Sequence, residues 1–415
     1  MSTRENFTVT KRYSTISIAL MVLGLIAIIA LYISTHGGGN HTEEEKLHQD
    51  ARFWASLLQN SVYFLLVVNA SMFFICATTL AWGGWQMAFR RVPEAIAACV
   101  PAVGVICGAI LLAILFSDNH TIYHWADPHH VEIDPALKEK SPFLNKGFFT
   151  VWTVLTIVLW WALGLKMRKL STSLDNNPLQ TVEAKRKYVW NNTVWAAVYI
   201  VVFALTVMST IPWFWLMSID AHWYSTMYSW YTFASTFVAG MALIGLFVIF
   251  LKNNNYLETT NVEHLHDIGK FIFAFSIFWT YLWFAQFMLI WYANIPEETI
   301  YFKGRAQGEY SGVFWLMLII NFIAPFLILM SRDAKRNYTT MTFVCIIVLF
   351  GHWLNFFQMV MPGVSPDHQP MMLYDLGVGL GFVGLIMFVT GRALSKHPLL
   401  GKNHPFTKES LIHHT

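Results

Sequence analysis

Long runs of apolar residues constrain this chain more than any other feature of its sequence. A helix needs about 20 mostly apolar residues to cross the hydrocarbon core of a bilayer. The central parts of these runs hold no Asp, Glu, Lys or Arg, and each run is bounded by charges or by Pro, Gly or Asn. The sequence therefore predicts an all-α integral membrane protein with ten transmembrane helices. The predicted spans are residues 12–34, 53–82, 92–116, 145–166, 188–210, 223–251, 269–293, 311–330, 338–361 and 371–394.

The composition agrees with this prediction. Only 12% of the 415 residues are charged, about half the share found in soluble domains. The aromatic share of 16% is typical of chains that place Trp and Tyr at the two membrane interfaces. The longest loop between spans has about 30 residues, which leaves no room for a soluble domain. The net charge of +3 gives no indication of nucleic-acid binding.

The basic residues predict an orientation. If the N-terminus is cytoplasmic, 20 of the 27 Lys and Arg residues lie on the cytoplasmic side and 7 on the other. Cytoplasmic segments carry such an excess, so we expect both termini in the cytoplasm. The four cysteines all lie inside apolar runs and form no CxxC or CxxCH group. We therefore expect no disulfide framework, iron–sulfur cluster, covalent haem or metal site on this chain.

One ionisable residue lies deep inside a predicted span. It is His352, and Asn355 follows three residues later on nearly the same helix face. Such a pair could relay protons or donate a hydrogen bond to a quinone carbonyl. The alternative is an ordinary polar contact between two helices.

Two further groups of polar residues lie at span ends. Asp220 and His222 precede the sixth span, where they could form a proton exit or contact a quinol, or Asp220 could simply cap the helix. At the start of the seventh span, His264 and Asp267 lie within about 40° of Gln286 and Tyr281, respectively, on a straight helix. This spacing predicts a polar track toward mid-membrane. The alternative is helix capping with separate contacts between helices.

The longest loop carries several histidines. Their spacing matches no standard metal site, and we expect this loop to dock on a partner. The spans also lack a mid-membrane carboxylate, which argues against an ion-coupled transporter but leaves a carrier of neutral solutes open. The loop residues are His120, His124, Asp127, His129 and His130.

Several stretches between the second and ninth spans resemble one known family. The chain is similar to the NrfD / polysulfide-reductase C-type family of membrane subunits, and in particular to the F-subunit family of bacterial alternative complex III. The combination is specific and covers most of the chain. The matching stretches are FRRVPEA (89–95), IYHWADP (122–128), SPFLNKGFF (141–149), WFWLMSIDAHWYSTMY (213–228), EHLHDIGKFIFAF (263–275), FWTYLWFAQFMLIWYANIPEET (278–299) and HWLNFFQMVMPG (352–363).

The resemblance implies an architecture. The second to fifth and the sixth to ninth helices would form two four-helix bundles, with the first and tenth helices at the periphery. Residues 1–52 would hold the N-terminal tail, the first helix and a loop. Residues 53–210 and 211–362 would hold the two bundles, and 363–415 the tenth helix and a cytoplasmic tail.

The resemblance also implies a function. The chain would be a subunit of a menaquinol:cytochrome c (or oxidase) oxidoreductase in the bacterial inner membrane, with no cofactor bound covalently. Its partners would be a homologous ten-helix subunit, an iron–sulfur subunit, c-type haem subunits, small membrane subunits and a terminal oxidase. The redox-active menaquinol site would lie on the homologous partner.

The family is proposed to move protons through polar half-channels. The alternatives from the residues alone are a purely structural scaffold of the same complex and a stand-alone secondary transporter of a neutral solute. The matching polar positions, which could form a proton pathway or contact a quinone, are Asp220, His222, His264, Asp267, Tyr281, Gln286, His352 and Asn355.

Overall fold

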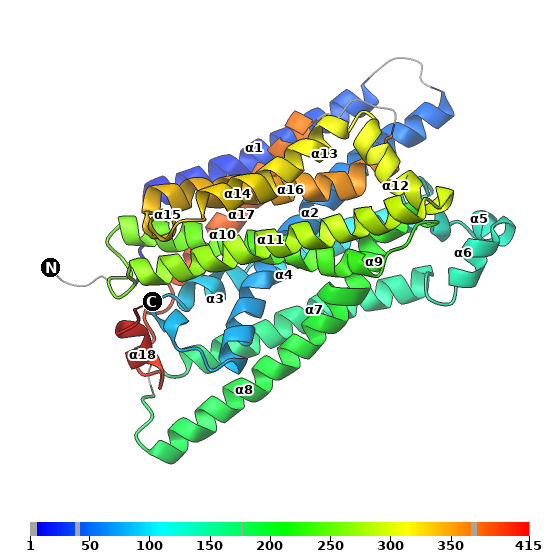
Figure 1. Cartoon of the computed structure of the whole chain (residues 1–415). Coiled ribbons are helices and arrows are strands. Elements are labelled where there is room, and N and C mark those ends of the chain that lie inside the picture. The colour runs from blue at the N-terminus through cyan, green and yellow to red at the C-terminus, as the bar shows by residue number, and fades with distance from the viewer. Residues whose placement is uncertain (1–5, 38–41, 176, 367–371, 415) are drawn as a thin grey trace.

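The computed structural model describes residues 6–37, 42–175, 177–366 and 372–414 (Figure 1). Within these ranges it contains ten helical spans long and apolar enough to cross a membrane and no β-strand, which confirms the predicted spans. The spans are α1 (Lys11–His36), α2 (Glu43–Leu80), α3 with α4 (Arg91–Ala97, Val100–Phe116), α7 (Lys146–Thr172), α8 with α9 (Val182–Leu205, Ile211–Trp215), α10 (Met227–Asn253), α11 (Val262–Ala293), α13 with α14 (Ser311–Leu318, Ala324–Ile328), α16 (Tyr338–Val364) and α17 (Met372–Leu394).

Short elements lie between the spans and after the last one. Several of them are helices of a single turn or two, and only α12 is longer. They are η1 (Trp85–Ala88), η2 (His124–Ala126), α5 (Pro128–Ile133), α6 (Pro135–Lys140), η4 (Met217–Asp220), α12 (Pro296–Gln307), α15 (Arg332–Arg336) and α18 (Thr407–Leu411).

Two spans contain a π-helical turn directly before a proline. The segments η3 (Thr206–Thr210) and η5 (Ile319–Ile323) precede Pro212 and Pro325, respectively. Proline lacks a backbone N–H and its ring clashes with the carbonyl four residues earlier. A wider turn accommodates that clash, so the helix continues to the far side of the membrane.

Helix starts follow local capping rules. Thr42 and Glu45 form a reciprocal capping box at the start of α2. The Asn261 side chain accepts hydrogen bonds from backbone N–H groups at the start of α11, and Asn337 does so at the start of α16. Each cap satisfies N–H groups that have no partner inside the helix, which fixes where the span begins.

The two ends of the molecule differ. The start of α1 and the short helix α18 lie at one end, which we call the terminus end, whereas α5, α6 and α12 lie at the opposite end (Figure 1). Helices α2 and α10 are the most buried spans, and α1 is the most exposed. The core therefore lies around α2 and α10, and the outer faces of the other helices are available to lipid or to partner chains.

Neighbouring spans pack in two groups around this core. Helix α2 contacts α4 and α8, and α7 contacts the same two helices. Helix α10 contacts α11 and α16, α13 contacts α16, and α14 contacts α11. Helix α2 also contacts α10 and α16, so the two groups share a continuous apolar interior.

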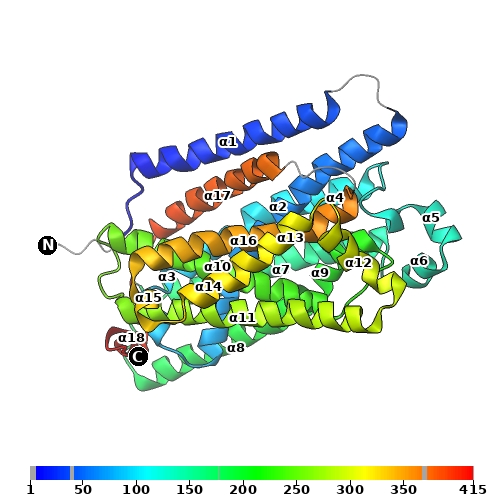
Figure 2. The same cartoon turned by 45° about the horizontal axis from the view of Figure 1, so that its top comes forward.

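Helices α1 and α17 form a separate pair at the edge of the molecule (Figure 2). Glycines lie where they meet, and a Cβ atom added to Gly24 would lie only 2.4 Å from the Gly381 Cα. Small residues let transmembrane helices approach this closely and gain van der Waals contact. A buried ion pair joins α17 to α2, in which Arg52 donates two hydrogen bonds of 2.6 and 3.1 Å to Asp375.

A second buried charge cluster lies in the FRRVPEA stretch at the terminus end. Glu94 accepts hydrogen bonds from both Arg90 (2.9 Å) and Arg91 (3.2 Å), and Arg91 also pairs with Asp175 at 2.5 Å. This network ties α3 to the segment that follows α7. It accounts for the charged residues of that stretch by structure alone.

Candidate functional site

A chain of buried polar side chains runs along the contact between α10 and α16. Ser235 and Tyr231 lie four residues apart on α10, and His352 and Asn355 lie three apart on α16, so each pair occupies one helix face. All four side chains are buried. In apolar surroundings an unpaired polar group raises the free energy of the folded state, so hydrogen bonds between such groups stabilise the fold.

His352 lies at the inner end of this chain. Its Nδ1 atom is 3.0 Å from the Ser235 Oγ, and the ring edge of His352 faces Trp279 at a centroid distance of 5.4 Å. Its Nε2 atom has no hydrogen-bond partner among the described residues. Among the described residues, His352 is thus hydrogen-bonded through Nδ1 alone, which leaves Nε2 to bond to water.

Asn355 connects His352 to the tyrosines. Its amide nitrogen donates to Ser235 Oγ at 3.0 Å, and its oxygen accepts from the Tyr231 hydroxyl. All bonds can then point the same way, from Tyr231 through Asn355 and Ser235 to His352 Nδ1. In that arrangement the remaining hydrogen of His352 resides on Nε2.

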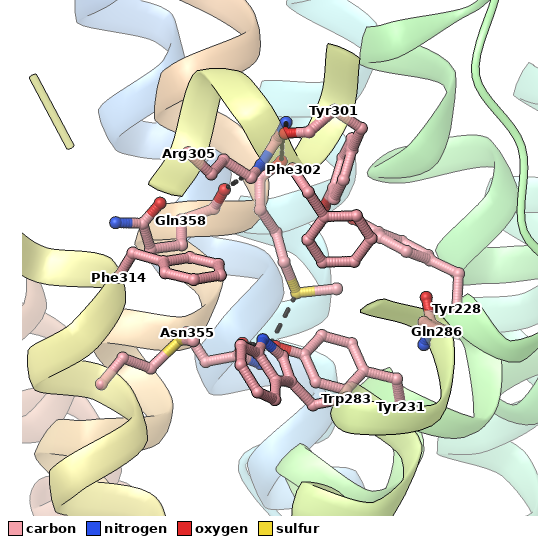
Figure 3. A pocket seen from close by; sticks show the side chains of 12 residues that line it. Tyr228, Tyr231, Trp283, Gln286, Tyr301, Phe302, Arg305, Phe314, Asn355 and Gln358 are labelled. Carbon is pink, nitrogen blue, oxygen red and sulfur yellow. Dashed lines mark hydrogen bonds between the residues drawn. The ribbon is translucent and has the colours of Figure 1, made fainter. Parts of the chain in front are cut away.

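A small cavity adjoins the Tyr231–Asn355 contact (Figure 3). It has room for the centre of a water-sized molecule over about 20 Å³, which is enough for about one water. Ligand pockets for larger molecules have volumes of roughly 300–1,000 Å³, so a quinone ring does not fit. Polar side chains that line the cavity are those of Tyr228, Tyr231, Gln286, Tyr301, Arg305, Asn355 and Gln358.

Arg305 closes the cavity toward the opposite end of the molecule. This α12 residue is only 5% exposed, and its Nη2 atom donates to the Asp220 carboxylate at 2.9 Å. It also donates to the backbone carbonyls of Gln358 and Tyr301 and lies over the Tyr301 ring at 3.4 Å. Burial would lower the pKa of Arg305, but Tyr301 and Asp220 reverse the effect and raise it, so the guanidinium stays charged.

Asp220 connects this row of polar side chains, the polar chain, to solvent. Its side chain is 28% exposed, while its partner Arg305 is buried. The residues from Asp220 to His352 therefore connect the surface of the opposite end with the interior of the membrane. The connection is continuous except at the water-sized cavity between Arg305 and Tyr231.

The structure brings four of the eight predicted residues into this site. Asp220, His352 and Asn355 belong to the polar chain. Gln286 lines the adjoining cavity and accepts a 3.3 Å hydrogen bond from Ser225. His222 lies apart, because its side chain is 69% exposed and pairs with Asp134 at 3.1 Å.

His264 and Asp267 form a second cluster at the terminus end. His264 Nε2 is 3.1 Å from Ser410 Oγ, and Asp267 Oδ2 is 2.6 Å from His413 Nε2. Asp267 also pairs with Lys270 at 2.5 Å. These residues therefore hold the segment that includes α18 against the start of α11.

The structure does not form the predicted polar track along α11. Tyr281 is 61% exposed on the outer surface, whereas Asp267 is buried. An offset of about 40° on a helix is enough to separate them, because the neighbours of α11 change along its length. His264 and Gln286 do share the buried face, but 22 residues of helix place them about 33 Å apart.

Apolar packing separates the two polar clusters. Between Asp267 and Trp279, over about 18 Å of helix, the buried α11 side chains are those of Ile268, Ile272 and one small polar residue, Ser276. Phenylalanines fill the adjoining space, and Phe237 and Phe275 lie 4.4 Å apart by ring centroids. The described residues thus provide no continuous polar path from one end to the other.

The loop histidines remain near one another at the opposite end. The rings of His124 and His130 lie 5.9 Å apart, and His130 pairs with Asp127 at 3.6 Å. Among the described residues, no group of three His, Cys, Asp or Glu side chains is placed to hold a metal ion.

Sequence reasoning missed several members of the site. It placed Arg305 among loop charges, and it passed over Tyr231 and Ser235 on α10. Their spacing of four residues on one helix face was the available signal, but Tyr228, Ser229, Thr232 and Thr236 of the same span obscure it. The pairing of Arg305 with Asp220 joins positions 85 residues apart, for which the sequence gives no local signal.

Comparisons with known proteins identify no family. Neither the protein-family models nor the curated proteins contain a match to this sequence.

Proposed function

We propose that this chain is a membrane subunit, without a redox cofactor of its own, of a menaquinol:cytochrome c (or oxidase) oxidoreductase. It would anchor the redox subunits and conduct protons through the polar chain between Asp220 and His352. The observation that supports the proton role is the row of polar side chains itself, which links the partly exposed Asp220 carboxylate to the buried His352 imidazole. The family resemblance supports the complex, with its iron–sulfur, c-type haem, small membrane and homologous ten-helix subunits.

The proposal includes location and architecture. The chain would reside in the bacterial inner membrane with the terminus end in the cytoplasm, as the excess of basic residues there supports. The group α2, α4, α7 and α8 and the group α10, α11, α13/α14 and α16 would be the two four-helix bundles of the family. Their mutual contacts support this assignment, as does the peripheral position of α1 and α17.

In the proposed half-channel each residue has a separate task. Asp220 exchanges protons with the outer solvent, and the buried, charged Arg305 holds the Asp220 carboxylate in place. A water in the cavity reaches Tyr231 and Asn355. The Asn355 amide orients the hydrogen bonds but does not itself relay a proton, and neither Ser235 nor His352 lines the cavity. A proton therefore passes from the cavity water to Ser235 only when the Asn355 side chain moves aside.

The apolar segment beyond His352 fits a half-channel. A polar path through the whole membrane would let protons leak back, whereas an apolar constriction excludes water. Phe237, Phe275 and Ile272 provide such a constriction on the terminus side of His352. Proton transfer beyond this point would require a change in packing driven by the partner subunits.

The decisive experiment replaces Ser235, which links Asn355 to His352. Ser235→Ala removes about two hydrogen bonds, at a cost of roughly 1–3 kcal/mol, so the complex should still assemble. Reconstituted into liposomes, it should oxidise quinol at the normal rate with a lowered proton-to-electron ratio. The matched control is Ser229→Ala. Ser229 is equally buried on α10, but it donates to the Ser209 carbonyl, which is not part of the proposed proton path.

The scaffold alternative makes the opposite prediction. It is favoured by the apolar segment, since the described residues show no complete path. An assembled Ser235→Ala complex with a normal proton-to-electron ratio would refute the half-channel and leave the scaffold role. Solute uptake by liposomes that contain this chain alone would instead support a transporter and contradict both.

A further inference from the structure

An apolar groove opens between α16 and α17, and α10 also contributes to its lining. Although consecutive in the chain, these two helices are parted, because α17 packs on α1, α2 and α3. Tyr63, Phe64 and Val67 of α2 form the floor, and the groove has a volume of about 590 Å³. Its lining is almost wholly apolar.

The groove lines only about half the length of a membrane span on each of these two helices. On α16 its lining runs from Thr342 to Trp353, and on α17 from Leu376 to Met387. Eleven residues of helix correspond to about 16 Å, which is half of a hydrocarbon core of about 30 Å. Such a length matches one leaflet and is too short for a transmembrane helix.

A polar network closes the inner end of the groove. Trp353 Nε1 donates to the Asn60 side chain at 2.8 Å, and Asn60 donates to the Asp375 carbonyl at 3.2 Å. The Asp375 carboxylate is itself bound to Arg52. The groove therefore opens only toward the terminus end and toward the lipid beside it.

Apart from the exposed Asn253 side chain at the mouth, the polar side-chain atoms along the groove are hydrogen-bonded within the protein. Tyr13 and Tyr63 donate to the carbonyls of Met387 and Leu349, both at 2.7 Å. The Thr342 hydroxyl donates to the Tyr338 carbonyl at 2.7 Å. Below the mouth, a quinone ring would find no donor that is not already bonded, whereas a saturated hydrocarbon chain needs none.

Basic residues flank the mouth of the groove. Lys11 and Arg12 directly precede the lining residue Tyr13, and Lys252 directly precedes the lining residue Asn253. Glu258 is the acidic residue beside Lys252, whose ammonium donates to the Glu258 carbonyl at 3.1 Å. The mouth thus carries an excess of positive charge that complements an anionic headgroup.

We propose that this groove binds an anionic phospholipid of the leaflet at the terminus end. One acyl chain would lie along the groove as far as Trp353, and the phosphate would lie near Lys11, Arg12 and Lys252. The length, the internally satisfied lining and the charge at the mouth each support this occupant.

The test measures lipid that stays bound to the full-length chain by native mass spectrometry. The chain is purified gently and equilibrated with equal amounts of phosphatidylglycerol and phosphatidylcholine. Two or three basic residues at the mouth predict a preference of at least about tenfold for phosphatidylglycerol. Equal retention of the two lipids would overturn the proposal.

A matched pair of variants tests the place of binding. Ile346 lines the groove and is 54% exposed, whereas Ile29 on α1 is 59% exposed and does not line it. Ile346→Trp should fill the groove and abolish retained phosphatidylglycerol, while Ile29→Trp should leave it unchanged. Thermal melts should show that both variants fold, since each replaces a half-exposed side chain.

Other outcomes contradict the proposal. Phosphatidylglycerol retained fully by the folded Ile346→Trp variant would place any bound lipid elsewhere. Loss of menaquinone instead of phospholipid in that variant would identify a quinone tail as the occupant. A crosslink from position 346 to a partner helix in the native complex would identify a protein occupant.

Discussion

The buried pair between Arg52 and Asp375 allows a quantitative prediction. Asp375→Asn keeps the shape of the side chain but removes its charge. Arg52 is 5% exposed and Asp375 is fully buried, so the variant leaves a guanidinium without its counter-ion in the protein interior. Breaking a buried pair in this way costs about 3–5 kcal/mol. We expect the unfolded fraction to rise between about 150-fold and several thousand-fold.

The assay is an SDS unfolding titration of the protein in mixed micelles. Arg52→Met combined with Asp375→Leu serves as the control, because it replaces the charged pair by an apolar pair of similar volume. Such replacements are often neutral or stabilising. The double variant should therefore regain most of the stability that Asp375→Asn loses. A loss below about 1 kcal/mol in Asp375→Asn would refute the reasoning, because it would show that water screens the pair.

Two further predictions concern the terminus end and the α1–α17 contact. Burial, then the nearby Arg90 and Arg91, lower the pKa of His404 from 6.5 to about 3. Neutral His404 accepts a hydrogen bond from the Phe406 N–H. Its contribution to the free energy of unfolding is therefore fully present above pH 6.5. As the pH falls below 6.5, that contribution is lost at about 1 kcal/mol per pH unit. Proteolysis of residues 401–414 should be faster at pH 5.5 than at pH 7.5, and His404→Gln should remove that difference. Equal proteolysis rates of the unmodified protein at the two pH values would contradict this prediction. Gly381→Leu should lower stability by about 1–3 kcal/mol, because a Cβ atom added there lies 2.9 Å from the Gly24 Cα. Gly312→Leu should not, because a Cβ atom there has nothing within 4 Å. Equal SDS unfolding midpoints for the two variants would contradict a close contact between α1 and α17.

Much of the fold could be predicted because each span is a local property. An apolar run of about 20 residues marks a span wherever it occurs, and cap residues such as Thr42 and Asn261 mark where helices begin. Pairings between spans are not local. Arg52 and Asp375 lie 323 positions apart, and no pattern near either residue indicates the other.

The site was predictable in part for the same reason. His352 and Asn355 stand out because polar side chains are costly in an apolar span. Tyr281 was misplaced because helix periodicity gives angles but not neighbours. His264 and Asp267 were assigned to a track toward the membrane centre, whereas they bind the segment around Ser410 and His413, far along the chain.

The contact between α1 and α17 has a consequence for biosynthesis. The face of α1 around Gly24 emerges from the ribosome about 350 residues before the glycines of α17 that cover it. At about 5–20 residues per second, that interval is roughly 20–70 s. During it, α1 must wait in the bilayer with Gly24 facing lipid or an insertion factor. Any other glycine-rich helix nearby could occupy that face first, so correct assembly depends on the timing of synthesis as well as on packing.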